Sequence, residues 1–179
     1  MESVDMAEKR ASKTSRTNTA FYSKALKAGI ASLMDEIRLA FQWSRPSILV
    51  AVHKGSAGQE KARAQLRKEI QAINKKVRNI EVNRNNLNVI QSALKSPDHA
   101  NIVFFVSGIG RNNENDRRSI YRALNFQREI LVDNRIILVL WLSAAEAGEI
   151  PHLAPDFWAF RHRVVEFAPE HNMTKKAAP

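Results

Sequence analysis

The sequence predicts a three-layer α/β domain with a mainly parallel sheet of four to five strands, preceded by an extra N-terminal amphipathic helix. Short apolar runs rich in β-branched residues alternate with segments of helical periodicity, and the connections are long enough for right-handed crossovers. The two strongest runs, NIVFFVSG (101–108) and RIILVLWLS (135–143), are apolar without alternation, as expected for strands covered on both faces. These two strands and the one that begins at Ser47 are therefore expected to be central and largely parallel.

Helical spacing of apolar residues predicts the first helix, from Thr19 to about Trp43. One face carries residues separated by four, three, four and four positions: Leu26, Ile30, Leu33, Ile37 and Phe41. The helix is expected to stop before Pro46, because a residue that precedes proline is pushed out of the α region. This face is too apolar to remain in water, so it either completes the domain core or contacts a protein partner or a second copy. On the second alternative, the interface residues are Ile30, Leu33 and Ile37.

The remaining elements follow in order along the chain. The patterns predict a strand at 47–53, a helix at 57–74, an edge strand at 76–82 and a short helix at 86–95. After the strand at 101–108, Asp116 is expected to cap a helix that runs to about Asp133. The strand at 135–143 leads to a short helix, a segment at 155–162 and a last strand at 163–167. We assign residues 1–18 to a disordered basic and polar tail, 19–168 to a single α/β domain and 169–179 to a flexible tail.

Composition excludes several classes of function. The 179 residues contain no cysteine, which excludes disulfides, thiolate catalysis and cysteine-based zinc sites, and suits a reducing cytoplasm. No apolar stretch reaches the roughly 18 residues of a membrane span, and the polar N-terminus is not a signal peptide. The five histidines lack metal-ligand spacing. We therefore expect a cytoplasmic protein without a membrane segment, a metal site or a cofactor.

The formal charge of +10 is concentrated in one part of the chain. Residues 54–84 hold nine Lys and Arg against three Glu, a net of +6. This segment is either a solvated helix face or a surface that contacts the phosphate backbone of nucleic acid. On the second alternative, the contacts are expected from Arg63, Arg67, Lys68, Lys75 and Lys76.

The stretch HKGSAGQEK (53–61) resembles the start of a phosphate-binding loop but lacks its essential groups. Gly55 and Gly58 are three positions apart instead of five, and Gln59 and Glu60 stand where Lys and Ser or Thr are needed. The strand at 101–108 also lacks a terminal carboxylate for magnesium. The sequence thus predicts that ATP with magnesium is neither bound nor hydrolysed.

A weaker site for a nucleotide or another anion remains an alternative, because loops that follow parallel strands meet at the carboxyl edge of the sheet. Its expected residues are Lys54, Gly55, Gly58, Lys61, Gly108, Gly110 and Arg111. Glu146 and Glu149 lie at the same edge without a companion motif. No catalytic residue is assigned.

The stretch APDFWAFRHRVVEF (154–167) concentrates aromatic and charged side chains. It is either a structural clamp that seals the end of the sheet or a protein-binding surface, since aromatic residues and arginine dominate interface anchors. On the second alternative, Trp158 and Arg161 are the expected interface residues.

Four stretches together resemble a Rossmann-like N-terminal α/β domain of large bacterial signalling proteins: EIRLAFQWSRPSILVAVH, NIVFFVSG, YRALNFQREILVDNRIILVLWLS and APDFWAFRHRVVEF. In those proteins the domain often precedes a STAND-type NTPase module, NB-ARC or NACHT-like, or tetratricopeptide repeats. The resemblance covers residues 35–167, and its last motif is the most specific. It implies an adaptor or sensor role in a regulatory or defence protein and carries no catalytic residues. The sequence ends at Pro179 with neither module, so it is either a free-standing version or a fragment.

The sequence thus favours a non-catalytic α/β protein-interaction domain. A basic nucleic-acid-binding protein is the first alternative, and a degenerate nucleotide-binding domain without hydrolysis is the second.

Overall fold

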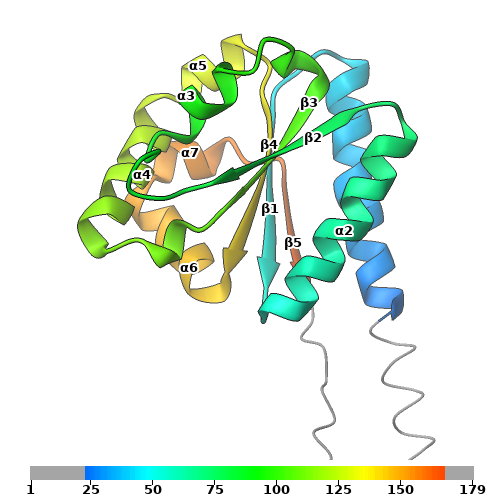
Figure 1. Cartoon of the computed structure of the whole chain (residues 1–179), viewed down its shortest axis with the longest axis horizontal. Coiled ribbons are helices and arrows are strands. Elements are labelled where there is room, and N and C mark those ends of the chain that lie inside the picture. Colours follow the sequence, from blue (N-terminus) through cyan, green and yellow to red (C-terminus); the bar gives the residue numbers. More distant parts are fainter. Residues whose placement is uncertain (1–22, 168–179) are drawn as a thin grey trace, which may run out of the picture.

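A computed structural model describes residues 23–167 and contains one five-stranded sheet (Figure 1). The expected tails, 1–18 and 169–179, lie outside the described residues. The strands are β1 (Ser47–His53), β2 (Lys76–Glu81), β3 (Ile102–Ser107), β4 (Ile137–Ser143) and β5 (Arg163–Phe167). All neighbouring strands are parallel, in the order β2-β3-β4-β1-β5. The predicted α/β class is confirmed, as are the central places of β1, β3 and β4 and the edge position of β2.

Helices cover both faces of the sheet and make three layers (Figure 1). The N-terminal helix (residues 23–42) and α2 (Ser56–Ala72) pack on one face. The other face carries five helices: α3 (Val89–Leu94), α4 (Glu114–Phe126), α5 (Arg128–Asp133), α6 (Ala144–Leu153) and α7 (Pro155–Ala159). Short 3₁₀ turns, η1 (His99–Asn101) and η2 (Ile109–Arg111), flank β3.

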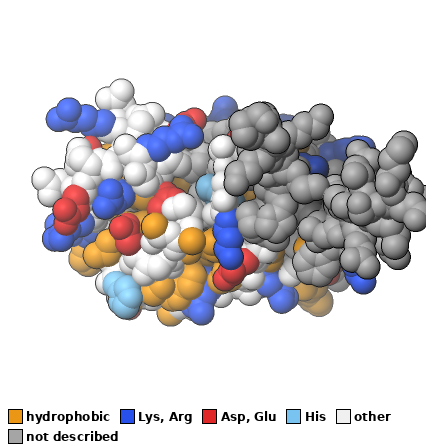
Figure 2. Space-filling view, turned by 90° about the horizontal axis from the view of Figure 1, so that it is seen from below, with side chains coloured by type: hydrophobic (Ala, Val, Ile, Leu, Met, Phe, Trp, Pro, Cys, Tyr) orange, Lys and Arg blue, Asp and Glu red, His pale blue; other side chains and the backbone are white. Residues whose placement is uncertain are grey.

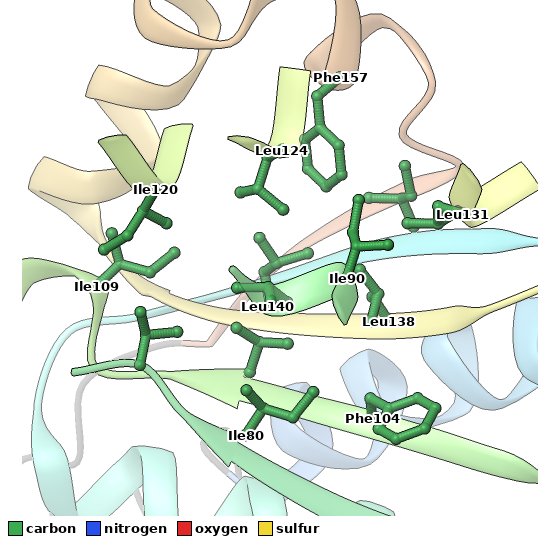
Figure 3. Packing of buried hydrophobic residues seen from close by; sticks show 14 of the residues in the cluster. Ile80, Ile90, Phe104, Ile109, Ile120, Leu124, Leu131, Leu138, Leu140 and Phe157 are labelled. Atoms are coloured by element: carbon green, nitrogen blue, oxygen red, sulfur yellow. The ribbon is translucent and has the colours of Figure 1, made fainter. Parts of the chain in front are cut away.

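Each central strand contributes side chains to two cores because neighbouring residues in a strand point to opposite faces. Figure 3 shows Phe104 and Leu140 of the sheet beneath Leu124 of α4 and Phe157 of α7. All four of these side chains are fully buried. The alternate positions of the same strands face the N-terminal helix and α2. Burial on both faces explains why these strands are apolar without alternation.

The apolar face of the N-terminal helix belongs to the domain's own core. Ile30 is 4% exposed, and Leu33 and Ile37 are 0% exposed, in one cluster with residues of β1 and β4. A side chain buried within the domain cannot contact a partner, so the expected interface role of these three residues is wrong. The alternative, that the helix completes the core, is confirmed.

An ion-pair cluster on Glu36 ties the N-terminal helix to the sheet. The Glu36 carboxylate, 12% exposed, accepts hydrogen bonds from Arg45 at 3.0 Å and from Arg163 at 2.8 Å. Burial raises the pKa of Glu36, but the hydrogen bonds and charges of the two arginines outweigh it, so the pKa lies below its usual value of 4.5. The ionised form of this carboxylate therefore stabilises the fold.

The helix expected from Asp116 to Asp133 is two helices. Its first part begins earlier, because Asn113 is the N-cap and its Oδ1 accepts a hydrogen bond from the backbone N–H of Asp116 at 2.9 Å. Asp116 instead lies in the first turn of α4, where its negative charge interacts favourably with the helix dipole. The chain leaves helical geometry at Gln127 and resumes as α5. Periodicity alone predicted one helix because both parts carry buried residues at helical spacing.

Candidate functional site: a polar cleft at the carboxyl edge of the sheet

The neighbouring strands β1 and β4 form the point where the direction of the fold reverses. The helix that follows β1 packs on one face of the sheet, and the helix that follows β4 packs on the other. The last residues of these strands, His53 and Ser143, are paired in register. Helices that diverge from adjacent strands leave a crevice outside the carboxyl ends, which is where ligands bind in open α/β sheets.

A cleft of about 450 Å³ lies at this crevice. The end of β1, the first half of α2, the end of β2, the turn after β3, the end of β4 and the start of α6 all contribute to it. Its lining residues are His53, Gln59, Glu60, Arg63, Asn79, Glu81, Ser107, Gly108, Gly110, Arg111, Trp141, Ser143 and Glu146. Figure 2 looks onto this end of the molecule and shows side chains of both charge signs interspersed over the described surface. The size is in the range of clefts that hold small molecules.

The loop after β3 is held in shape by its backbone and by one asparagine. Gly108 has a φ of 90°, and a Cβ there would lie 3.0 Å from the Val82 carbonyl oxygen. Only glycine adopts this conformation in that space without strain. The Asn112 Nδ2 donates to the carbonyl oxygens of Gly108 at 2.8 Å and of Val82 at 3.2 Å. The loop therefore presents Arg111 beside Glu81, with which it forms an ion pair.

Glu146 connects two of the loops. Its Oε2 accepts from the backbone N–H of Ser143 at 2.6 Å, while the Ser143 hydroxyl accepts from the Glu146 N–H, which completes a capping box on α6. Its Oε1 accepts from the N–H of Gly110 at 2.6 Å. A Cβ on Gly110 would lie 2.9 Å from the Glu146 Cδ. Both carboxylate oxygens are occupied by backbone amides, so Glu146 holds the cleft wall in place.

His53 lines the cleft, and its pKa lies below the usual value for histidine. Burial lowers its pKa, and the nearby Glu146 carboxylate and the Gly55 backbone oppose that effect only in part. Within residues 23–167, no three His, Asp or Glu side chains gather in an arrangement that could hold a metal ion. What the cleft offers is a set of hydrogen-bonding groups with two arginines.

Arg63 is the least expected part of the cleft. Its side chain is 14% exposed and lies against the sheet, with its guanidinium carbon 6.0 Å from the centroid of the Trp141 ring. It donates to the Ser107 Oγ and to the Asn79 Oδ1, both at 3.3 Å. In the sequence alone, Arg63 is one of several cations on a basic helix. The one sequence signal for its burial is its position directly after Ala62, which lies on the apolar side of α2.

The residues expected to form an anion site divide into two groups. Gly108, Gly110 and Arg111 line the cleft, whereas Lys54, Gly55, Gly58 and Lys61 do not. Gly55 is the N-cap of α2, which begins at Ser56, and Gly58 is buried. The chain enters the helix too soon after β1 to form a loop around a phosphate group. This part of the chain instead contributes His53 from the end of β1 and Gln59 and Glu60 from the start of α2.

The five expected nucleic-acid contacts do not form one stripe. Arg67, like Arg63, turns toward the sheet: it donates to the Asn79 Oδ1 at 2.9 Å, and its guanidinium carbon lies 5.6 Å from the centroid of the Phe105 ring. Near the start of β2, the Lys75 Nζ donates to the Asn101 side chain at 2.7 Å, and Lys76 pairs with Asp98 at 3.2 Å. Lys68 is exposed on α2. Four of the five cations thus already contact other groups of the domain.

A second surface gathers aromatic and arginine side chains at the end of α4, the start of α5 and α7. We define the α4–α7 surface by Phe126, Arg128, Trp158, Phe160 and Arg161. Phe126 is 73% exposed and Phe160 is 44% exposed. The Arg161 guanidinium lies 4.2 Å from the centroid of the Trp158 ring, and that of Arg128 lies 5.9 Å from the centroid of the Phe160 ring.

The 154–167 stretch is in part a structural clamp, and its role as a protein-binding surface stays a prediction. Its Phe157 and Phe167 are buried in opposite cores and seal the end of the sheet. The side chains that remain accessible include Trp158 and Arg161, which were the expected interface residues.

Models of known protein families and the curated proteins contain no match to this chain. No helix of residues 23–167 is both long and apolar enough to cross a bilayer.

Proposed function

We propose that this chain is a non-catalytic α/β protein-interaction domain, an adaptor or sensor in a bacterial regulatory or defence signalling system in the cytoplasm. The observation that carries the proposal is the α4–α7 surface, where the exposed Phe126, Phe160 and Arg161 accompany the half-buried Arg128 and Trp158. Aromatic residues and arginine are the side chains that most often dominate binding energy at protein interfaces. Single exposed apolar residues are common, but a group with stacked arginines is the composition of an interface anchor.

The arginines on this surface are arranged to bind a partner at low entropic cost. Arg161 stacks on Trp158 and donates to its carbonyl oxygen at 2.8 Å. Arg128 contacts Asp156 at 3.6 Å and donates to the Asn125 carbonyl oxygen at 3.0 Å. Side chains already held by such contacts lose less conformational freedom on binding. Arg161 is exposed, so its remaining N–H groups are available to acidic or carbonyl groups of a partner protein or of a second copy.

The test compares two variants that each remove exposed aromatic area. Phe126→Ser with Phe160→Ser removes the rings of the α4–α7 surface, whereas Trp43→Ser removes a ring, 68% exposed, after the helix on the opposite layer. Sedimentation velocity over a range of protein concentrations measures self-association. Affinity capture from the source cell, with mass spectrometry, measures partner binding by all three proteins.

We expect the wild type and Trp43→Ser to self-associate or to capture the same partner, and the double variant to do neither while keeping its melting temperature. A wild type that stays monomeric at high concentration and captures no protein contradicts the proposal. Equal loss in Trp43→Ser contradicts the assignment of the surface.

A further inference from the structure

Among the described residues, no carboxylate accepts a hydrogen bond from the largely buried Arg63 side chain. Its two hydrogen bonds, to Ser107 and Asn79, are made to neutral oxygens. The carboxylate within 4 Å of it is that of Glu60, which lies 3.9 Å away and is 73% exposed. Buried charges in proteins are usually paired, because leaving water is costly for an ion without a partner. An anion that enters the cleft would supply the missing charge.

The other charged groups of the cleft limit the charge of that anion. Arg111 is already paired with Glu81, and the oxygens of Glu146 are held by backbone amides. Arg63 is therefore the one lining cation, within the described residues, whose hydrogen bonds are all to neutral partners. The cleft is suited to a single anionic group and not to a polyphosphate with magnesium.

Trp141, another residue that lines the cleft, carries a second buried donor. Trp141 is 1% exposed, and its Nε1 has no hydrogen-bond partner among the described residues. A buried indole N–H normally finds an acceptor. Trp141 lies next to Arg63 and stacks on Phe167, with ring centroids 5.9 Å apart. The ring is therefore fixed in place beside the guanidinium.

The remaining lining groups indicate what carries the anionic group. Trp141 is the one large apolar side chain among the lining residues described, so there is no apolar slot for a nucleobase. Side-chain amides, hydroxyls and carboxylates surround the rest of the cleft, in Gln59, Asn79, Ser107, Ser143 and Glu81. Such groups are donors and acceptors for hydroxyl groups.

We propose that the cleft is a binding site for a small hydroxyl-rich oxyanion, either a sugar phosphate or a sugar acid, whose anionic group binds Arg63. The planar guanidinium binds the oxyanion through paired N–H donors. The polar side chains around the cleft bind the remaining oxygens. The site is independent of the protein-interaction proposal, since it lies at the carboxyl edge and needs no partner.

The experiment titrates the whole chain with four probes, by calorimetry and by tryptophan fluorescence. Ribose 5-phosphate and glucuronate are the two oxyanion arms, ribose is the neutral control, and ATP with magnesium tests the nucleotide alternative. We expect one oxyanion arm to saturate, and the saturating arm distinguishes the phosphate from the carboxylate source. Saturation by neither oxyanion up to about 10 mM, the weak end of specific binding, overturns the proposal. Tighter binding of ATP than of either oxyanion overturns the ligand class.

Arg63→Met separates a binding role from a structural one. Methionine keeps the apolar stem of the side chain over Trp141 but removes the charge. We expect the affinity for the oxyanion to fall at least about tenfold, and the melting temperature to stay equal or rise, because an uncompensated buried charge is removed. Arg122→Gln removes the same charge from an exposed position on α4 and is expected to leave binding unchanged. Unchanged affinity in Arg63→Met, or a lower melting temperature, contradicts the proposal.

Discussion

Glu146 gives a sharp test of how the cleft is built. Glu146→Ala removes a carboxylate that accepts two hydrogen bonds of 2.6 Å, from Ser143 and from Gly110, and that completes the capping box of α6. A hydrogen bond to a charged group contributes about 1.5–3 kcal/mol. The side chain is half-buried, so water replaces part of each bond in the variant. We therefore expect a loss of about 2–3 kcal/mol in the free energy of unfolding, which is at or below the lower limit for two such bonds.

Glu149→Ala is the matched control. It removes a glutamate from the same helix, but one whose carboxylate is 37% exposed and contacts Arg117 at 3.5 Å. Such a pair contributes under about 1 kcal/mol. Urea denaturation followed by circular dichroism measures both variants. For a chain of this size, the loss in Glu146→Ala corresponds to a fall of roughly 4–12 °C in melting temperature.

Equal losses in the two variants would refute the reasoning, because they would mean that the hydrogen bonds from Ser143 and Gly110 contribute no more than a surface ion pair. A loss in Glu146→Ala with unchanged oxyanion binding would show that the loops keep their places without the carboxylate.

Three further predictions concern other parts of the fold. Gly29→Ala should lower the free energy of unfolding by about 1 kcal/mol, because the new Cβ would lie 2.8 Å from the Phe167 ring and overpacking outweighs the gain in helix propensity. Gly148→Ala, whose Cβ would meet no neighbouring group within 4 Å, should raise that free energy by up to about 1 kcal/mol. Thermal melts compare the two variants. Arg135→Gly should raise the free energy of unfolding by about 0.5–1 kcal/mol, because φ is 54° at this position and glycine adopts a positive φ without strain. Arg135→Ala keeps the strain and should show no such gain in urea denaturation. Because the pKa of Glu36 is lowered in the folded state, its carboxylate contributes fully to the free energy of unfolding above about pH 4.5, and this contribution is lost as the pH falls through the folded-state pKa. Melting temperatures measured from pH 7 to pH 2 should therefore fall less steeply in Glu36→Gln than in the wild type.

Local sequence predicted the elements wherever one physical requirement dominated. The run from Ile102 and the run from Ile137 had to be central strands because burial on both faces leaves no polar position. Asp116 was the wrong cap because Asn113 and Asp116 both suit a helix start, and the choice depends on how the loop after β3 is folded. The break at Gln127 was missed because the buried residues on both sides keep helical spacing.

The candidate site was predicted less completely than the fold. The glycine pattern predicted that Gly55 and Gly58 belong to an anion site, but Gly55 is the N-cap of α2 and Gly58 lies on the buried side of that helix. The loop after β3 was correctly expected at the carboxyl edge, and Gly108, Gly110 and Arg111 do line the cleft there. His53, Asn79 and Trp141 were missed, because none of them belongs to a motif and they come together only when their strands pair.

The sequence by itself determined the class of fold, the central strands and the lack of P-loop residues, since apolar periodicity and residue identity depend only on neighbours along the chain. Only the tertiary structure decided the roles of the charges and of the first helix. Leu33 is core and not interface because the helix packs on the sheet, and Arg63 is buried because α2 places it over Trp141. Electrostatic environment and burial are set by groups that are distant in the chain. The sequence alone is therefore compatible with a solvated Arg63, whereas the structure places Arg63 beside Asn79 and Ser107.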